Sequence, residues 1–365
     1  MLNGNILIVG GYGAVGRVIA TNLAEKFPGQ VIVAGRSYEK ANALAQESGG
    51  KIRPLQTNIF TAHQTPEILD GVALVVMCLD LPDTQFVQLC LQKGVHYIDV
   101  TASYDFLMQV EALHGVAKLG GSTAVLSVGI APGLTNLLAS YAQSQFDELE
   151  NLDIHILLGL GEAHGEAAVR WMVENLNADF TVMEKGVEKP ARSFADGKQT
   201  TFPGKLGRRT TYRFDFSDQH VIPRTLGIPL VSMRIAFDSA WMTRFMAVMK
   251  TIGLFGLLRY QWAQDTLVKL LRRFHFGSEL FVAQVDGHGF VDGERKSKSF
   301  AVVGEQEARF TGLVAAQVAE KMVTAVYPSG VFHIEQLFAP LPFIEALAVY
   351  NLDFHHPVAS EKVST

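Results

Sequence analysis

Three glycines near the amino terminus, Gly11, Gly13 and Gly16, have the spacing of a loop that binds the pyrophosphate of a dinucleotide. Apolar residues 5–9 precede them like a short strand, and a segment with helical periodicity follows. Glycine permits the tight turn, the close approach of the main chain to a phosphate, and close packing of helix on strand. The helix amino terminus then offers unpaired N–H groups to the phosphates. We therefore expect a cofactor to contact Gly11, Tyr12, Gly13, Ala14, Val15 and Gly16.

The same loop has two other interpretations. An ordinary glycine-rich turn would use the same residues, and it remains the alternative. A P-loop is excluded, because Arg17 and Val18 stand where Lys followed by Ser or Thr would be needed.

The end of the second predicted strand, residues 31–34, distinguishes between the nicotinamide cofactors. NAD sites usually carry Asp or Glu there for the ribose 2′-hydroxyl group, but this chain has Arg36 and Ser37, with Lys40 one turn later. A guanidinium can pair with a 2′-phosphate, which a carboxylate would repel. The sequence therefore predicts NADP(H), with the 2′-phosphate at Arg36 and Ser37. The alternative is that Arg36 only caps a surface turn.

The elements that must position these residues alternate between strand and helix in the first third of the chain. The six expected strands are continuous apolar runs, which indicates a parallel sheet covered on both faces, the Rossmann-type doubly wound α/β fold. They are residues 5–9, 31–34, 51–55, 73–77, 96–100 and 123–128.

After about residue 145 the pattern changes to that of a second, α+β domain. A hairpin is expected from residues 280–285 to 299–303, with turns at 287–289 and 292–293. Residues 310–326 form an apolar helical pattern that could pack back on the first domain.

Candidate acid–base groups lie in both domains. Asp99 and Tyr104 lie at the carboxyl end of the fifth strand, at the sheet edge where ligands bind in such folds. His164 lies in a glycine-rich turn before a helix, and His220 lies in a polar cluster. The alternatives are a turn-capping Asp, a packed Tyr and structural histidines. No metal site is expected, because the eleven histidines are scattered.

The sequence resembles the saccharopine dehydrogenase family in its NADP-dependent, saccharopine-reductase-like branch, which also includes lysine and carboxynorspermidine dehydrogenases. The motifs that carry this resemblance are the glycine loop and residues 34–37, 94–101, 103–104, 129–136, 330–331 and 335. The family usually has an acidic residue directly before the Pro132-Gly133 pair, where this chain has Ala131. That departure argues against saccharopine itself as the substrate.

The resemblance implies a discontinuous nucleotide domain, residues 1–130 with 310–345, and an inserted substrate and dimerisation domain, residues 131–309, before a tail at 346–365. It implies that residues 99–104 lie near the nicotinamide and that Pro132 borders the same cleft, which adds Thr101, Ser103 and Pro132 to the expected cofactor contacts. It also implies hydride transfer at a carbon–nitrogen bond, and a homodimer.

Composition limits the partners and the location. A formal charge of −5 excludes a broad nucleic-acid-binding face, and two cysteines with no secretory signal indicate the cytoplasm. The charge-free residues 119–146 contain Pro132-Gly133 and are not expected to span a membrane. Residues 241–258 could lie on a membrane surface, although a buried helix pair is the preferred interpretation.

We therefore expect an NADP(H)-dependent oxidoreductase acting on an imine or secondary amine of a small, amino-acid-like or amine substrate. One alternative is a reductase of a C=C or C=O bond in a lipid-like substrate, with an apolar pocket formed by residues 237–258, Phe274, Phe276 and Phe281, although these residues could equally be core. The other is a non-catalytic module that binds NADPH or docks on membranes.

Overall fold

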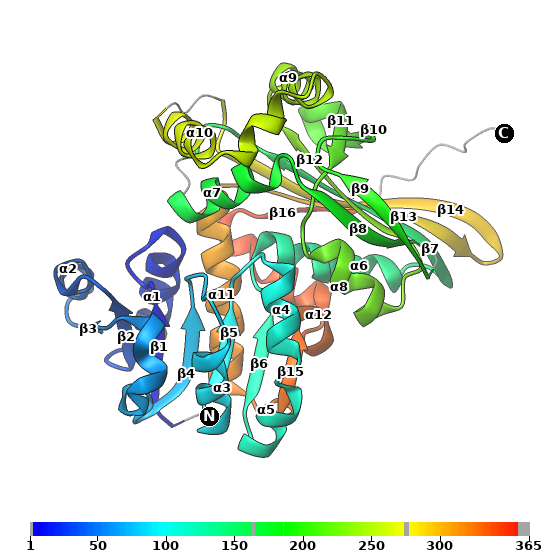
Figure 1. The fold of residues 1–365 in the computed structure, drawn as a ribbon. Coiled ribbons are helices and arrows are strands. Elements are labelled where there is room, and N and C mark those ends of the chain that lie inside the picture. Colours follow the sequence, from blue (N-terminus) through cyan, green and yellow to red (C-terminus); the bar gives the residue numbers. More distant parts are fainter. Residues whose placement is uncertain (1–2, 163–164, 185, 274–276, 357–365) are drawn as a thin grey trace. The chain divides into compact units, whose positions relative to one another are not determined.

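The computed structural model describes residues 3–162, 165–184, 186–273 and 277–356. The chain divides into two compact units (Figure 1). Unit 1 is Met1–Gly133 with Ala308–Phe338, and unit 2 is Leu134–Glu307 with Ala339–Thr365.

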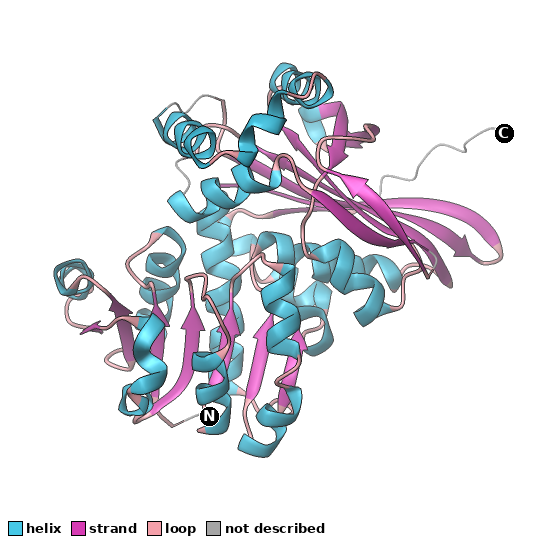
Figure 2. Ribbon diagram, in the orientation of Figure 1, coloured by secondary structure: helices cyan, strands magenta, loops and turns pink. Residues whose placement is uncertain are grey.

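Unit 1 contains a seven-stranded sheet in the order β15-β6-β5-β4-β1-β2-β3, and every neighbouring pair is parallel (Figure 2). The central strands are buried along most of their length, as the continuous apolar runs predict. The doubly wound prediction is confirmed. The strands are β1 (Asn5–Val9), β2 (Val31–Gly35), β3 (Ile52–Gln56), β4 (Val72–Met77), β5 (His96–Asp99), β6 (Thr123–Leu126) and β15 (Gly330–His333).

Helices connect these strands, and a late segment of the chain returns to unit 1. A Cβ atom on Gly312 would lie 2.7 Å from Cβ of Val18, so α11 packs closely on α1, and β15 extends the sheet beside β6. The helices are α1 (Ala14–Lys26), α2 (Tyr38–Glu47), α3 (Gln85–Gln92), α4 (Tyr104–Glu111), α5 (His114–Gly120), α11 (Glu307–Thr324) and α12 (Ile334–Leu337), with 3-10 turns η1 (Ile59–Gln64) and η2 (Pro66–Leu69) and the irregular segment η3 (Ile130–Leu134).

Unit 2 contains a second seven-stranded sheet in the order β10-β11-β12-β7-β13-β14-β16. Only the β12–β7 pair is parallel. The strands are β7 (Glu148–Leu158), β10 (Lys198–Phe202), β11 (Gly207–Arg213), β12 (Val231–Phe237), β13 (Leu280–Val291), β14 (Glu294–Glu305) and β16 (Asp353–His355), and β8 (Asp179–Glu184) pairs with β9 (Val187–Arg192) in a separate ribbon.

Helices on this unit complete the α+β arrangement expected from the sequence. They are α6 (Thr135–Gln143), α7 (Glu166–Asn175), α8 (Asp218–Leu226), α9 (Ala240–Thr251), α10 (Gln261–Arg273) and α13 (Pro340–Glu345), with 3-10 turns η4 (Gly204–Leu206), η5 (Leu254–Arg259) and η6 (Ala348–Tyr350). No helix among the described residues is both long enough and apolar enough to cross a bilayer.

The β13–β14 hairpin differs in one respect from its prediction. The turn at residues 292–293 is present, but residues 287–289 continue the strand. The pairing with β7 shifts at this point, and a Cβ atom on Gly289 would lie 2.0 Å from the carbonyl oxygen of Glu148. These glycines therefore permit a close approach of two strands rather than a reversal of the chain.

The carboxyl-terminal boundaries also differ from the predicted ones. Residues 339–345 belong to unit 2 instead of the nucleotide domain, and the predicted tail at 346–365 includes β16, which pairs with β14. A strand of three residues is too short to show a periodic pattern.

Candidate functional site

The glycine loop of unit 1 connects β1 to α1 in a conformation that only small residues allow. A Cβ atom on Gly16 would lie 2.4 Å from the carbonyl oxygen of Gly10, so helix and loop are in direct main-chain contact. Gly10 itself has a φ of +76°. The loop therefore has the close packing of helix on loop for which the last glycine of the motif is needed.

Gly13 differs from Gly16, because it is exposed and has room on its outer side. It is the N-cap of α1 with extended backbone, and within the described residues no side chain caps the helix there and no acidic residue occupies its first turn. A Cβ atom at this position would meet only the carbonyl oxygen of Gly10, at 3.2 Å. The positive end of the helix dipole is therefore accessible to an anion.

The end of β2 adds a cationic side chain beside this loop. Gly35 lies under the ring of Tyr12, where a Cβ atom would be 2.4 Å from Cε1, and the Ser37 amide donates to the Tyr12 hydroxyl group at 3.3 Å. The next residue, Arg36, is exposed, and in the described part of the chain no carboxylate lies within 4 Å of it. Arg36 is thus placed next to the glycine loop with its charge uncompensated.

Ser37 is already engaged in the structure. Its hydroxyl group caps α2 by accepting from the Lys40 amide at 3.3 Å, and it donates to Oε2 of Glu39 at 2.8 Å. The pKa of Glu39 is lowered by a backbone hydrogen bond to its carboxylate and, to a smaller extent, by the hydrogen bond from Ser37. The Glu39 carboxylate therefore already binds the hydroxyl group of Ser37, which was predicted to contact the 2′-phosphate.

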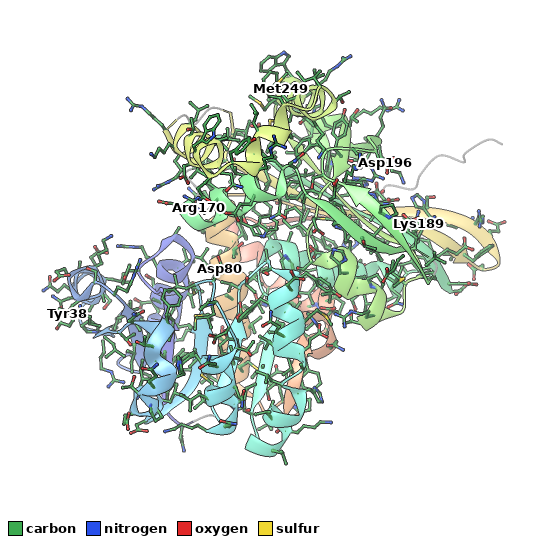
Figure 3. All side chains as sticks on the ribbon, viewed as in Figure 1. Tyr38, Asp80, Arg170, Lys189, Asp196 and Met249 are labelled. Atoms are coloured by element: carbon green, nitrogen blue, oxygen red, sulfur yellow. The ribbon has the colours of Figure 1, made fainter. Side chains whose placement is uncertain are left out.

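The loops after β1, β4 and β5 are linked at the carboxyl edge of the sheet. Gly10, in the loop after β1, lies against Leu79 in the loop after β4, because a Cβ atom on Gly10 would touch that side chain. The hydroxyl group of Thr101, in the loop after β5, donates to Asp80 at 3.1 Å (Figure 3). Ser103 caps α4 by accepting from the Phe106 amide at 3.4 Å. Two of the predicted contacts, Thr101 and Ser103, therefore belong to one hydrogen-bonded turn.

Asp99 lies beneath this turn and is only 1% exposed. Its carboxylate accepts from the Tyr97 hydroxyl group at 2.5 Å and from the Thr101 amide at 2.8 Å. Burial raises the pKa of Asp99 to about 7, against the opposing effect of these two hydrogen bonds. The predicted role of Asp99 in proton transfer stays a prediction, and the contacts favour a positioning residue that holds the turn.

The raised pKa of Asp99 leads to a test by stability. The unfolded chain releases this proton near pH 4 and the folded chain near pH 7, so the folded state holds more protons in this window. The free energy of unfolding should therefore fall as the pH rises from about 4 to about 7, by up to about 4 kcal/mol, and then level off. Asp99→Asn should remove this dependence and make the protein more stable than wild type at neutral pH.

Urea unfolding of wild type and Asp99→Asn across this pH range measures the effect. The two curves should coincide at the acid end and separate towards neutrality. Curves that stay parallel throughout would show that Asp99 is ionised in the folded protein.

The remaining predicted groups of unit 1 are also located. Tyr104 is the first residue of α4 and is half-buried. Pro132 follows β6, and the Ala131–Pro132 peptide is cis. Both residues therefore follow strands at the same edge of the sheet as the glycine loop.

Of the two histidines predicted as acid–base groups of the second domain, only His220 lies within the described residues. His164 lies outside the described residues. His220 is on α8, and its Nε2 atom is 2.7 Å from Oδ1 of Asp215. This pair can carry a proton, so His220 stays a candidate acid within unit 2.

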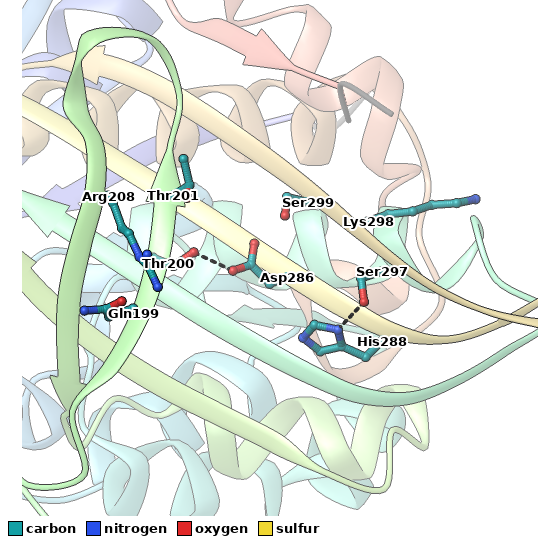
Figure 4. A pocket seen from close by; sticks show the side chains of 9 residues that line it. All are labelled: Gln199, Thr200, Thr201, Arg208, Asp286, His288, Ser297, Lys298 and Ser299. Atoms are coloured by element: carbon teal, nitrogen blue, oxygen red, sulfur yellow. Dashed lines mark hydrogen bonds between the residues drawn. The ribbon is translucent and has the colours of Figure 1, made fainter. Parts of the chain in front are cut away.

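A polar pocket of about 360 Å³ in unit 2 was not foreseen (Figure 4). Asp286 on its floor accepts from Thr200 at 2.7 Å and from Gln284 at 2.8 Å, and His288 lies 2.7 Å from Oγ of Ser297. Gln284, Asp286 and His288 alternate along β13, and this period of two is the signal that could have identified the polar face.

The carboxylates around this pocket are already paired within unit 2. Burial opposes their ionisation, but hydrogen bonds outweigh it and lower the pKa of Asp286 to about 2 and that of Asp153 well below its usual range. Lys198 and Ser232 each lie 2.5 Å from Asp153. The network fastens the β10–β11 hairpin to the sheet, which is a structural role.

The apolar segment proposed for a lipid pocket divides between core and surface. Phe237, Phe255 and Phe281 are buried in unit 2 at 3%, 6% and 0% exposure, whereas Trp241 is 69% exposed. Phe274 and Phe276 lie outside the described residues. The preferred interpretation of residues 241–258 as a buried helix pair is therefore wrong for one face of α9. No group of three or more potential ligand side chains for a metal occurs in the part of the chain that the structure describes.

Comparison with known proteins finds that the first unit is similar to a nucleotide-binding domain. Residues 6–125 match the family model of the saccharopine dehydrogenase NADP binding domain. Carboxynorspermidine synthase of Vibrio cholerae serotype O1 is 22% identical over 291 residues, which cover 72% of this chain and 70% of that protein.

Solved structures share the whole architecture at low identity. Apo saccharopine dehydrogenase (L-Glu forming) from Saccharomyces cerevisiae is 14% identical with a TM-score of 0.67, covering 97% of this chain and 99% of that chain. Amine dehydrogenase from Mycobacterium smegmatis is 11% identical with a TM-score of 0.50, covering 92% and 96%. At such identities these similarities establish the fold.

Proposed function

The chain belongs to the saccharopine dehydrogenase family through its NADP-binding domain, and from this premise we propose that it transfers hydride between NADP(H) and a carbon–nitrogen bond of a small amine or amino-acid-like substrate. It is an oxidoreductase, and NADP(H) is its cofactor. The single observation in the structure that supports the cofactor is the exposed, uncapped amino terminus of α1 at Gly13, with Arg36 following the adjacent strand β2.

The residues of unit 1 fit the parts of this cofactor. The pyrophosphate would receive hydrogen bonds from main-chain amides at the start of α1, and the 2′-phosphate would pair with Arg36. At the amino terminus of α2 the 2′-phosphate would replace the Glu39 carboxylate as the partner of Ser37. The bound cofactor supplies a hydride to the substrate carbon.

The substrate class rests on the family and on one relative. Carboxynorspermidine synthase is named for an amine, which supports an imine or secondary amine rather than an alcohol. Ala131 before Pro132-Gly133 argues against saccharopine itself, because no carboxylate at that position is available to bind an amino group.

The reaction also needs a proton at the substrate nitrogen. We assign Tyr104 as the proton donor, because it begins α4 on the hydrogen-bonded turn that Asp99 and Ser103 hold. His220 with Asp215 is the second candidate. In the reductive direction the imine carbon gains the hydride and its nitrogen gains the proton, leaving NADP⁺ and the amine.

The activity is tested by incubating the purified protein with NADPH and pairs of carbonyl compounds and amines. Oxidation of NADPH that requires both members of a pair is the expected result. NADPH oxidation with enones or ketones alone would favour the alternative lipid-like substrate. Tight NADPH binding without turnover on any substrate class would favour a non-catalytic module.

Substitution of Tyr104 by Phe should lower kcat about 100-fold without changing the Kd for NADPH, because only proton transfer is lost. The matched control is Tyr38→Phe, at a tyrosine on α2 that is 45% exposed (Figure 3). A Tyr104→Phe enzyme with unchanged kcat would assign the proton to another group, with His220→Gln as the next variant.

The homodimer and the cytoplasmic location stay predictions of this proposal. Sedimentation velocity of the purified chain checks the first, and cell fractionation checks the second.

A further inference from the structure

The segment that contains α9, η5 and α10 exposes an unusual number of large apolar side chains. We call this surface the aromatic–basic face. Nine of its side chains are between 40% and 69% exposed: Trp241, Phe245, Val248, Ile252, Leu254, Leu257, Tyr260, Trp262 and Leu270. Contiguous exposed apolar surface of this kind marks an interaction site in a folded protein.

The apolar residues of α9 form one stripe. Trp241, Phe245, Val248 and Ile252 are spaced by four, three and four residues, so they lie along one side of the helix. The opposite side is buried on the sheet of unit 2 through Thr243 and Ala247. Because the helix already has its own buried face, the exposed stripe is a second apolar face without a partner in unit 2.

Ring stacking orders the largest side chains of this face. The rings of Trp241 and Phe245 are stacked at 5.4 Å between centroids, and those of Tyr260 and Trp262 at 6.5 Å. The guanidinium of Arg259 lies 4.7 Å from the centroid of the Tyr260 ring. Turn η5 packs against both helices, so it joins the two aromatic pairs.

Basic residues accompany these rings, although the whole chain is acidic. Residues 240–273 include a single acidic residue, Asp265, which is held by Arg170 at 2.9 Å. The basic residues are Arg244, Lys250, Arg259, Lys269, Arg272 and Arg273. Among the described residues, no carboxylate lies within 4 Å of Arg244, Lys269 or Arg273.

The basic residues occupy the same sides of the helices as the apolar ones. Arg244 lies three residues after Trp241, is exposed, and borders the apolar stripe of α9. On α10, Lys269 and Arg273 follow Trp262 by seven and eleven residues, which places them on the side of the exposed tryptophan.

We propose that the aromatic–basic face binds the surface of an anionic phospholipid bilayer. Trp and Tyr side chains prefer the interface between headgroups and acyl chains, and Leu, Ile and Phe enter the acyl region beside them. Uncompensated Lys and Arg side chains are attracted to anionic headgroups. The protein would then lie on the membrane surface.

Charge argues against a second copy of the chain as the occupant. A two-fold contact places the same patch on both subunits, so Arg244, Lys269 and Arg273 would meet a patch in which Asp265 is the single acidic residue and is already held by Arg170. A bilayer that carries negative charge supplies the missing partner for every one of these side chains.

Flotation of the purified protein with lipid vesicles tests the proposal. Vesicles made of equal parts of phosphatidylglycerol and phosphatidylcholine should carry the protein upward in a density gradient, whereas pure phosphatidylcholine should retain roughly tenfold less. Raising the salt concentration should weaken the binding to the anionic vesicles, because the attraction is screened. Failure of the wild-type protein to float with anionic vesicles would overturn the proposal.

Tryptophan fluorescence reports which face enters the lipid. The chain has three tryptophans, and Trp171 packs against Phe214 and Phe216 within unit 2. In a Trp171→Phe variant the emission therefore comes from Trp241 and Trp262. A blue shift on addition of anionic vesicles is expected, and binding without a shift would place the contact elsewhere.

Two variants separate the apolar and electrostatic contributions. The double substitution Trp241→Ser and Trp262→Ser should reduce flotation at least about tenfold. Arg244→Glu with Lys269→Glu should abolish the preference for anionic vesicles. The matched control replaces Leu119 and Val326, which are both 93% exposed in unit 1, by serine and should float like wild type.

NADPH binding and oligomeric state are measured on the same variants. Both should be unchanged in the tryptophan and charge variants, because their substitutions lie outside unit 1 and outside the acid–base groups assigned above. If the tryptophan variant instead converts a dimer to a monomer, the face is an interface between two copies and the membrane proposal is wrong. If neither the wild-type protein nor any variant shows NADPH oxidation, the proposed reaction is wrong. The membrane proposal is not affected by that result, because vesicle binding needs no turnover.

Discussion

Substitution of Gly13 by Val is expected to raise the Kd for NADPH by at least about 100-fold while leaving unit 1 folded. Gly13 is exposed and its φ of −74° is open to an L residue, so valine needs only a shift of a few tenths of an ångström at the Gly10 carbonyl oxygen, 3.2 Å from the added Cβ atom. The branched side chain would then occupy the space in which the pyrophosphate approaches the main-chain amides of α1. The loss would therefore be one of binding and not of stability.

Fluorescence titration with NADPH and a thermal melt of the same sample measure the two effects. Gly16→Val is the informative control, because its Cβ atom would lie 2.4 Å from the Gly10 carbonyl oxygen and should destabilise the domain itself. Gly13→Val protein that melts like wild type and binds NADPH normally would place the pyrophosphate away from this loop.

Substitution of Arg36 by Asp should reverse the cofactor preference, with a change of roughly 100-fold in the ratio of the NADPH and NADH affinities. The guanidinium has no carboxylate within 4 Å among the described residues, so its charge is available to the 2′-phosphate. An aspartate at this position would repel that phosphate and accept a hydrogen bond from the ribose 2′-hydroxyl group of NADH.

Parallel titrations with NADPH and NADH measure the ratio. Arg53→Asp changes the same charge on the exposed side of β3, away from the carboxyl end of the sheet, and should leave the ratio unchanged. If Arg36→Asp weakens both cofactors equally, Arg36 does not contact the 2′-phosphate.

The nucleotide unit could be predicted from sequence because its signals are local. The glycine spacing, the apolar strands and the Gly35-Arg36-Ser37 turn each follow from neighbouring residues, and the structure places them at one edge of a parallel sheet. The burial of Asp99 could not be foreseen, because it depends on Tyr97 and on the packing of the adjacent strands.

The features of unit 2 that were missed depend on contacts distant in sequence. Asp286 receives hydrogen bonds from Thr200 on another strand, and the close approach at Gly289 depends on Glu148. The two faces of α9 also could not be distinguished by composition, because the larger apolar side chains lie on the exposed face while Thr243 and Ala247 are buried, and only the fold determines which face is covered.

A crystal structure of the protein with NADP⁺ tests the central claim most directly. We predict the pyrophosphate on the main-chain amides at Gly13 and the 2′-phosphate within hydrogen-bonding distance of the Arg36 guanidinium. A nucleotide bound elsewhere, or an Arg36 side chain turned away from the 2′-phosphate, would contradict it.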